Sequence, residues 1–423
     1  MPYQPRVVDS ELDDLLLALP AVAVDGAKGV GKTATASRRA DHVVNLDDPA
    51  QLILLQADPS WLDTLNGTVL VDEWQRHPPV WDHVRRAVDD DAGAGRYLLT
   101  GSAAPIDAVV HSGAGRIVRL RMRPMALAER GLVPPTVSLG DLLSGTRPKV
   151  SGQSPVALAG YVDEILASGF PGIRTLTGRA RRAQLAGYLQ RVVDRDFPEL
   201  GHQVRRPETL RAWLAAYAAA TATTTSYNAL LEAATAGHGE RPAKTTTIAY
   251  RDTLAHLWLL DPVPGWTPGY GHLGRLGQAP KHHLVDPALA ATLLGVDAGR
   301  LISGAPAGPA VPRDGTLLGA LFESLVTLSV RVYAQLHEAQ VSHLRLHDGR
   351  HEVDLIVERP DGAVVAAEVK LGGVIGDDDV KHLHWLRDRL GDRLLDSVVI
   401  STGPTAYRRP DGVAVVPAAL LGV

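Results

Sequence analysis

Short apolar runs alternate with helix-compatible stretches along the first part of the chain. The runs suited to buried strands lie at residues 21–25, 42–46, 68–71, 96–100 and 117–122. Strands that alternate with helices in this order indicate a mostly parallel sheet with helices on both faces. We therefore predict an α/β fold that begins with a three-layer α/β/α domain over residues 1–130.

The spacing of apolar positions changes after this first domain. Residues 131–154 are rich in Gly, Pro, Ser and Thr, which is typical of a linker or loop. Apolar positions then recur with helical spacing at residues 156–166 and 178–197. We predict a linker and a helical segment over residues 131–205.

A second helical region follows. Its pattern is a helix, a turn, a helix and an extended segment, at residues 226–235, 237–242, 245–257 and 258–263. This order is typical of a winged helix, which we predict over residues 206–280. In a DNA reader the second helix, which carries Lys244 and Arg251, would enter the major groove. A role in packing or dimerisation is the alternative, because basic residues are sparse in this region.

The last part of the chain has the pattern of another α/β unit, which we predict over residues 281–423. Its expected elements are a long helix at 317–336, strands at 351–358 and 363–370, a helix at 378–390 and a strand at 397–401. The dipeptide Asp361-Gly362 favours a tight hairpin turn between the first two strands. These two strands are therefore expected to pair.

Composition limits the possible classes of protein. A chain of 423 residues with 45% hydrophobic residues is long enough for two or three domains with packed cores. It has no Cys, which excludes disulfides and Cys-ligated zinc. We find no run of about 18 apolar residues and no secretory signal at the start, so we expect a cytoplasmic protein without a membrane partner. The net charge of −4 gives no overall attraction to nucleic acid, and DNA binding would need a local basic patch.

The clearest chemical signal is G-A-K-G-V-G-K-T at residues 26–33, which fits the phosphate-binding loop G-x-x-x-x-G-K-[ST] between a strand and a helix. The residues expected to bind ATP are Gly26, Ala27, Lys28, Gly29, Val30, Gly31, Lys32 and Thr33. Backbone N–H groups of such a loop wrap around phosphate oxygens, and the helix start adds its positive dipole end. Lys32 is expected to reach the β- and γ-phosphates, and the Thr33 hydroxyl to ligate Mg²⁺.

Further candidates follow at the strand ends. Asp72 and Glu73 stand after the third strand, where one carboxylate can bind Mg²⁺ and the next can polarise the attacking water. Thr100, at the tip of the next strand, could orient that water or contact the γ-phosphate, or belong to a simple turn. Arg116, in a glycine-rich loop, is the candidate to stabilise charge on the γ-phosphate, in cis or from a neighbouring subunit of a homo-oligomer.

A second set of charged residues lies in the C-terminal unit. Glu368 and Lys370 are two positions apart on one strand and share a face, where Asp354 of the paired strand can meet them. Glu323 on the preceding helix could add a third carboxylate. Such a group can bind Mg²⁺ or Mn²⁺ and activate water for attack on a phosphodiester. A solvated hairpin face is the alternative.

The arrangement Asp354…Glu368-x-Lys370, preceded by Glu323, resembles the PD-(D/E)xK restriction-endonuclease-like superfamily, although Val353 stands where that motif has Pro. The whole chain resembles prokaryotic AAA-type P-loop ATPases fused to a C-terminal domain of unknown function with this nuclease-like fold. Further matching motifs are Gly169-Phe170-Pro171, Asp194-Arg195-Asp196 and Val285-Asp286-Pro287. The resemblance implies a P-loop ATPase domain, a winged-helix middle domain and a nuclease-like end.

These features predict a Mg²⁺-dependent ATPase that binds single- or double-stranded DNA. Hydrolysis would be coupled to the nuclease-like domain in DNA repair or defence if that domain is active; deoxyribonuclease activity is left open. The alternative is a nucleotide-dependent regulatory switch or a chaperone-like ATPase that acts on protein partners, with a catalytically silent nuclease fold.

Overall fold

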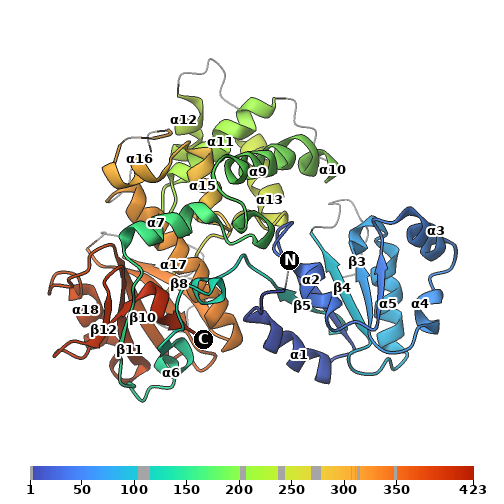
Figure 1. The fold of residues 1–423 in the computed structure, drawn as a ribbon, viewed down its shortest axis with the longest axis horizontal. Helices are drawn as coiled ribbons and strands as arrows, with labels where there is room; N and C mark the ends of the chain where they lie inside the picture. Colours follow the sequence, from blue (N-terminus) through green and yellow to red (C-terminus); the bar gives the residue numbers. More distant parts are fainter. Residues whose placement is uncertain are drawn as a thin grey trace.

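The computed structural model describes most of the chain. The described residues are 3–102, 115–200, 206–236, 243–267, 278–305, 307–309, 311, 315–346 and 350–423. The first domain stands to one side of the molecule, and the helices of the middle region pack above the C-terminal sheet (Figure 1). The chain thus forms three parts.

The first part is a five-stranded parallel sheet with the strand order β2-β3-β4-β1-β5. Its strands are β1 (Ala21–Asp25), β2 (His42–Asn45), β3 (Val69–Asp72), β4 (Tyr97–Gly101) and β5 (Val118–Arg121). Its helices are α1 (Val8–Ala18), α2 (Lys32–Ser37), α3 (Pro49–Ala57), α4 (Trp61–Thr64) and α5 (Pro79–Asp89). All five strands lie where the apolar runs predicted them, to within about one residue at each end.

Alternation along these strands explains why helices cover both faces. On β1, Val22 and Val24 face one core, which includes Leu12 of α1, whereas Ala21 and Ala23 face the other. Residues of α3, α4 and α5 belong to that second core. Successive strand residues point to opposite faces, so an entirely apolar strand needs cover on both. The α/β fold and the three layers of the first domain are therefore as predicted.

Residues 131–154 differ from the expected linker. Strand β6 (Val137–Ser138) pairs with the end of the chain, and β7 (Gly152–Gln153) pairs with a strand of the C-terminal sheet. Between them α6 (Leu139–Leu143) buries three leucines against that sheet and its long helix. Gly, Pro and Ser in this segment shape turns between docked elements, so their abundance did not mark a free tether.

The middle region is helical. Its helices are α7 (Leu158–Ala167), α8 (Pro171–Arg174), α9 (Gly178–Arg191), α10 (Phe197–Glu199), α11 (Pro207–Ala219), α12 (Tyr227–Thr235), α13 (Lys244–His256), α15 (Pro287–Leu293) and α16 (Ala298–Ser303). After α13, Leu260 pairs with Leu284 and Val263 with Lys281 in antiparallel bridges. Three helices followed by two antiparallel extended segments is the order expected of a winged helix. That assignment, like a DNA-reading role for α13, stays a prediction.

The C-terminal part is a mixed seven-stranded sheet with the order β7-β12-β13-β11-β10-β9-β8. Its remaining strands are β8 (Gln340–Arg345), β9 (Glu352–Glu358), β10 (Val364–Lys370), β11 (Leu394–Ser401), β12 (Thr405–Arg408) and β13 (Ala414–Pro417), and β14 (Leu421–Gly422) pairs outside this sheet. The helix α18 (Lys381–Leu390) flanks it. Strands β9 and β10 pair antiparallel, as the predicted turn required.

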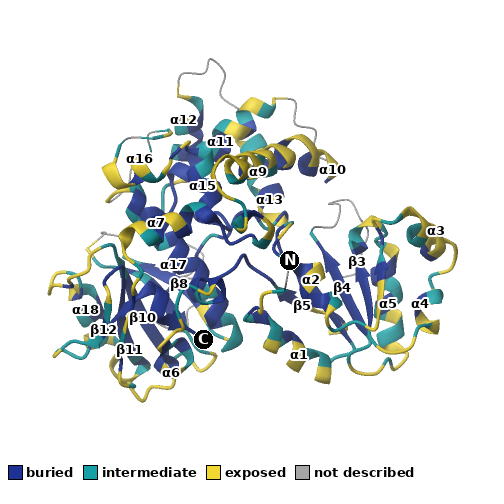
Figure 2. Cartoon of the chain, viewed as in Figure 1, coloured by how far each residue is buried: buried dark blue, intermediate teal, exposed yellow. Residues whose placement is uncertain are grey.

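One further helix, α17 (Leu317–Leu336), joins the parts. It contacts α6, α7, α15, β8 and β10. Its mean hydropathy of 1.4 and length of 20 residues would suit a bilayer, but 67% of that stretch is buried inside the protein. Burial of the sheets and of α17 is visible as dark blue in Figure 2, whereas α9 carries many exposed residues. The length and apolar character of α17 are therefore those of a core helix.

Candidate functional site

The P-loop connects β1 to α2 as the sequence predicted. Gly26 lies so close to the segment that follows β5 that an added Cβ would sit 2.2 Å from the Met122 carbonyl oxygen. Gly31, which caps α2, has a φ of +107°, in the left-handed region that favours glycine. Glycine is therefore required at both positions by the backbone path of the loop.

Lys32 already points back over this loop. Its Nζ donates hydrogen bonds to the carbonyl oxygens of Gly26, at 2.8 Å, and Ala27, at 3.2 Å. Burial lowers the pKa of Lys32 to about 8, although Glu73 and Asp72 act in the opposite direction. The ammonium thus lies in a poorly hydrated site beside the loop, where the negative charge of a phosphate would be attracted strongly.

The predicted Mg²⁺ ligands are brought together. The Thr33 hydroxyl donates to the Asp72 carboxylate at 2.8 Å. Thr100 is fully buried and donates to the same oxygen of Asp72 at 2.5 Å. Thr100 therefore positions Asp72, and its predicted contact with water or γ-phosphate remains a prediction. A hydroxyl and a carboxylate fit Mg²⁺, which usually takes one or two protein oxygens together with substrate phosphates.

Glu73 follows β3 in a strained conformation. Its φ of 56° and ψ of 42° lie in the left-handed region, which is rare for a residue other than glycine. The Gln75 amide donates to its carboxylate. Such strain of about 1–3 kcal/mol is concentrated at functional sites, which supports the role predicted for Glu73.

Arg116 lies away from the P-loop. It precedes β5, and β5 runs parallel to β1, so Arg116 is at the amino end of the sheet whereas the P-loop follows the carboxyl end. There its Nε donates to Asp89 at 2.8 Å. The prediction that Arg116 contacts the γ-phosphate in cis is therefore wrong. Its action from a neighbouring subunit stays a prediction.

A cavity of about 280 Å³ lies beside the P-loop, and the middle region forms its other wall. Its lining includes Lys28, Glu73 and Ser102 from the first domain. Tyr188 and Arg191 of α9 line the opposite side. These two residues had no motif to identify them, and their only signal was the helical pattern that carries them.

Two contacts hold α9 over the P-loop. The Tyr188 hydroxyl donates to the Lys28 carbonyl oxygen at 3.1 Å, and its ring packs on Phe170, with the ring centroids 5.1 Å apart. Arg191 Nε lies 3.7 Å from Oδ1 of Asp196, the last residue of the π-helical segment Val192–Asp196. π-Helical turns are rare and frequently mark functional sites. The Asp194-Arg195-Asp196 motif therefore lies in a π-helical segment.

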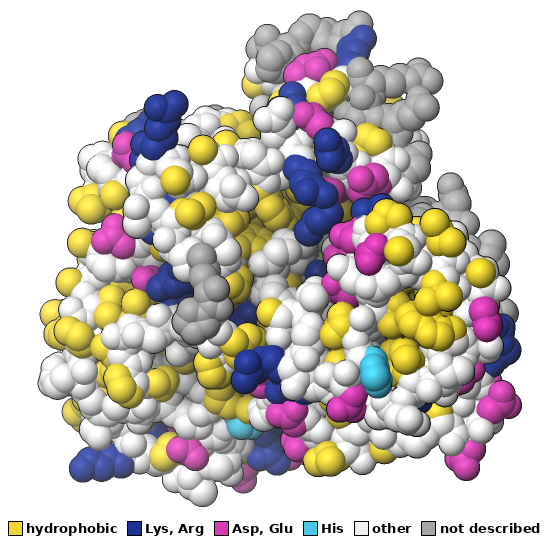
Figure 3. Space-filling view, turned by 45° about the vertical axis from the view of Figure 1, so that its right-hand side comes forward, with side chains coloured by type: hydrophobic (Ala, Val, Ile, Leu, Met, Phe, Trp, Pro, Cys, Tyr) yellow, Lys and Arg dark blue, Asp and Glu magenta, His cyan; other side chains and the backbone are white. Residues whose placement is uncertain are grey.

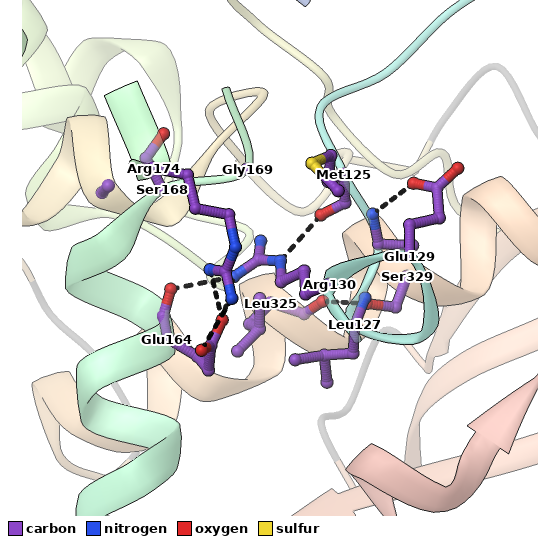
Figure 4. A network of polar contacts seen from close by, with 12 residues as sticks. Met125, Leu127, Glu129, Arg130, Glu164, Ser168, Gly169, Arg174, Leu325 and Ser329 are labelled. Atoms are coloured by element: carbon purple, nitrogen blue, oxygen red, sulfur yellow. Dashed lines mark hydrogen bonds and ion pairs between the residues drawn. The ribbon is translucent and has the colours of Figure 1, made fainter. Parts of the chain in front are cut away.

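The junction between the first domain and the later parts of the chain is a buried polar network (Figure 4). Arg130 is buried and donates to the Met125 carbonyl oxygen and to Glu164 of α7. Arg174 makes two hydrogen bonds to the same Glu164 carboxylate, at 2.6 and 2.9 Å. Ser329 of α17 accepts from the Leu127 backbone at 3.1 Å. The end of the first domain is thus fixed to both later parts of the chain.

The predicted C-terminal residues Glu323, Asp354, Glu368 and Lys370 line one cavity of about 610 Å³. Lys370 pairs with Glu368 at 2.9 Å. Burial raises the pKa of Glu323 to about 8, although Lys281 opposes this. Burial also acts to raise the pKa of Asp354, but Lys281 and Lys370 outweigh it and hold that pKa below its usual range. Lys281 was not predicted, because a single lysine far away in the sequence carries no signal.

Comparison with protein families finds three matching stretches of the chain. A profile described as "AAA domain" matches residues 19–130. Two profiles for domains of unknown function, DUF8612 and DUF4143, match residues 159–300 and 318–421. Residues 19–130 form a P-loop ATPase domain. The other two profiles name neither a winged helix nor a nuclease, so both assignments stay predictions.

Similar proteins add little about activity. Uncharacterized proteins of Mycobacterium bovis and Mycobacterium tuberculosis are each 26% identical over 291 residues, which is 66% of this chain. The chain spans only 57% of the length of these relatives. Among solved structures, the Walker-type ATPase PABY2304 of Pyrococcus abyssi is 16% identical, with a TM-score of 0.40 over 67% of this chain and 94% of that one. The ORC2 protein of Aeropyrum pernix is 13% identical, with a TM-score of 0.33 over 77% and 96%. At these TM-scores neither structure bears on the details of this chain.

Proposed function

We propose that this protein is a Mg²⁺-dependent ATPase whose nucleotide site is covered by the middle region. The observation that carries the proposal is the meeting of Thr33 and Asp72, at 2.8 Å, beside the buried Lys32 of the P-loop. A hydroxyl, a carboxylate and an ammonium gathered next to a loop of backbone N–H groups suit a nucleoside triphosphate.

Each residue has a separate task in this proposal. Lys32 exchanges its two carbonyl partners for phosphate oxygens and holds them in place. Thr33 and Asp72 would hold Mg²⁺, which supplies positive charge against the phosphate oxygens. Glu73 orients a water molecule and accepts its proton. Arg191 lies in the wall of the cavity and supplies, within the same chain, the cation that Arg116 does not supply in cis.

ATP turnover by purified variants tests this proposal. Lys32→Ala is expected to abolish turnover, and Glu73→Gln to bind ATP without hydrolysing it. Lys149→Ala, which removes an exposed lysine in another part of the chain, is the matched control and should keep the wild-type rate. Equal turnover by Lys32→Ala and wild type would refute the proposal.

We retain DNA as the proposed partner on one observation. Helix α9 exposes Arg179 and Arg182 near its start, on the same helix whose last residue, Arg191, lines the nucleotide cavity. The space-filling view shows Lys and Arg side chains spread over the visible face, with one group in its upper middle next to Asp and Glu side chains (Figure 3). Phosphate contacts of this kind are local and sensitive to salt. We do not extend the proposal to DNA cleavage, because Lys281 lies among the carboxylates that would hold the metal.

Fluorescence anisotropy with single- and double-stranded DNA at two salt concentrations tests this partner. Binding should weaken at the higher salt concentration and in the double variant Arg179→Ala/Arg182→Ala. No signal at low salt would instead favour the alternative, a switch or chaperone-like ATPase that acts on proteins. Stimulation of ATP turnover by DNA would link the two activities.

A further inference from the structure

The C-terminal cavity holds a cation supplied by the chain itself. Lys281 Nζ lies 2.8 Å from Asp354 Oδ1, 2.9 Å from Glu323 Oε1 and 3.0 Å from Glu352 Oε1. An ammonium group has three N–H donors, and here three carboxylates surround it. The Lys281 side chain is only 2% exposed. This cation is therefore enclosed by acidic partners from two elements of the fold, α17 and β9.

The backbone keeps Lys281 in this place. Its N–H donates to the Val263 carbonyl oxygen and its carbonyl oxygen accepts from the Val263 N–H, both at 2.9 Å. The two segments belong to the antiparallel pair that follows α13. The lysine thus reaches the C-terminal domain from the middle region. Its main chain is fixed by two hydrogen bonds to Val263, and its ammonium group is held by the three carboxylates.

This arrangement conflicts with the divalent metal that a nuclease-like fold implies. Glu323 and Asp354, which we predicted as metal ligands with Glu368, both give an oxygen to Lys281. The third, Glu368, is paired with Lys370 instead. A divalent ion between the same oxygens would stand close to an enclosed ammonium, where like charges repel strongly. Within the described ranges, no group of three or more His, Asp or Glu residues is arranged to hold a metal.

We propose that Lys281 replaces the divalent metal of this site, so that the C-terminal domain carries out no metal-dependent cleavage. The carboxylates then neutralise a lysine that fastens the middle region to the C-terminal sheet. Replacing Lys281 by an uncharged side chain of similar length should then leave a vacant acidic site that accepts a divalent ion.

Mn²⁺ binding by the full chain without nucleotide tests this. All variants carry Asp72→Asn, so that the P-loop site does not contribute. With Lys281 intact, we expect no Mn²⁺ bound at the C-terminal site by electron paramagnetic resonance. Lys281→Met should gain one Mn²⁺ site. Its dissociation constant should be at least about tenfold lower than that of any residual Mn²⁺ binding by the protein with Lys281 intact. Lys281→Arg keeps the cation and should gain none.

Two outcomes would overturn the inference. One is Mn²⁺ binding with Lys281 intact that disappears in Asp354→Asn, because the carboxylates would then hold a metal beside the lysine. The other is a folded Lys281→Met protein that gains no site. The melting temperature provides a second measure, since Mn²⁺ should raise it in Lys281→Met only. If Lys281→Met does not fold, Mn²⁺ binding is still compared between the protein with Lys281 intact and its Asp354→Asn variant. Binding that is lost in that variant would overturn the inference.

Discussion

Asp261 offers the sharpest test of how the three parts are held together. Its carboxylate is 5% exposed and lies between Arg123, at 2.8 Å, Arg331, at 2.9 Å, and Arg121, at 3.0 Å. Two of these arginines follow or end β5 of the ATPase domain, and Arg331 belongs to α17. A single carboxylate therefore joins the ATPase domain to the core helix of the C-terminal part. The change Asp261→Asn removes its charge at nearly constant volume.

The magnitude follows from burial. Taking one partner from a buried ion pair costs about 3–5 kcal/mol, because the other charge is left without compensation. Three guanidinium groups lose their counterion here, so we expect the upper part of that range. The unfolding entropy of a chain of 423 residues is roughly 0.9 kcal/mol per kelvin if it unfolds as one unit. A loss of about 4–5 kcal/mol should then lower the melting temperature by roughly 5 °C.

Differential scanning calorimetry of Asp261→Asn and wild type measures this shift. Asp252→Asn is the matched control, because Asp252 is exposed and pairs with Arg251 at the surface. Exposed pairs contribute at most about 1 kcal/mol, so the control should melt within about 1 °C of wild type. If the melting temperature of Asp261→Asn also lies within about 1 °C of wild type, the Asp261 carboxylate does not stabilise the contact between the ATPase domain and α17.

Three other predictions concern the nucleotide site and acid stability. Arg191→Ala should lower kcat for ATP about 10²-fold or more with little change in ATP affinity, whereas Arg195→Ala, which changes a residue outside the lining of the cavity, should not. Thr100→Val removes a hydrogen bond to Asp72 and should raise the Mg²⁺ concentration needed for half-maximal turnover about 10-fold or more; an unchanged Mg²⁺ profile would contradict its positioning role. Burial, helped by Lys281, lowers the pKa of His283 to about 3, against about 6.5 in the unfolded chain. The unfolded state therefore binds the extra proton first, and stability present above pH 6.5 is lost as the pH falls toward 3. The loss should be about 2 kcal/mol at pH 5, and urea unfolding of His283→Phe should show a correspondingly smaller decrease.

Local features of this protein could be predicted from its sequence. The strand β1, the P-loop and the start of α2 are consecutive, and each depends on residue types at short spacing. The carboxyl ends of parallel strands meet at one edge of a sheet, so Asp72 could be expected near Thr33 although 39 positions separate them. Alternation along β9 and β10 likewise brought Asp354 and Glu368 to one cavity. In each case a simple periodicity of the backbone carried the prediction.

The error over Arg116 has the same physical basis. Its glycine-rich loop suggested a movable side chain, but the loop precedes β5, and residues before a parallel strand lie at the opposite edge from the P-loop. The direction of the strand was more informative than the glycines. Residues 131–154 show a related limit, because their composition indicated a loop but could not show that the loop docks on a sheet.

The sequence alone determined the nucleotide chemistry, since the P-loop concentrates its donors within eight consecutive residues. Only the tertiary structure decided what surrounds that chemistry. Arg191 and Tyr188 reach the nucleotide cavity because α9 folds back over the P-loop. Lys281 meets Glu323 and Asp354 across 42 and 73 positions of the chain. Such contacts depend on how whole helices and sheets pack, and no spacing of residue types along the chain specifies that packing.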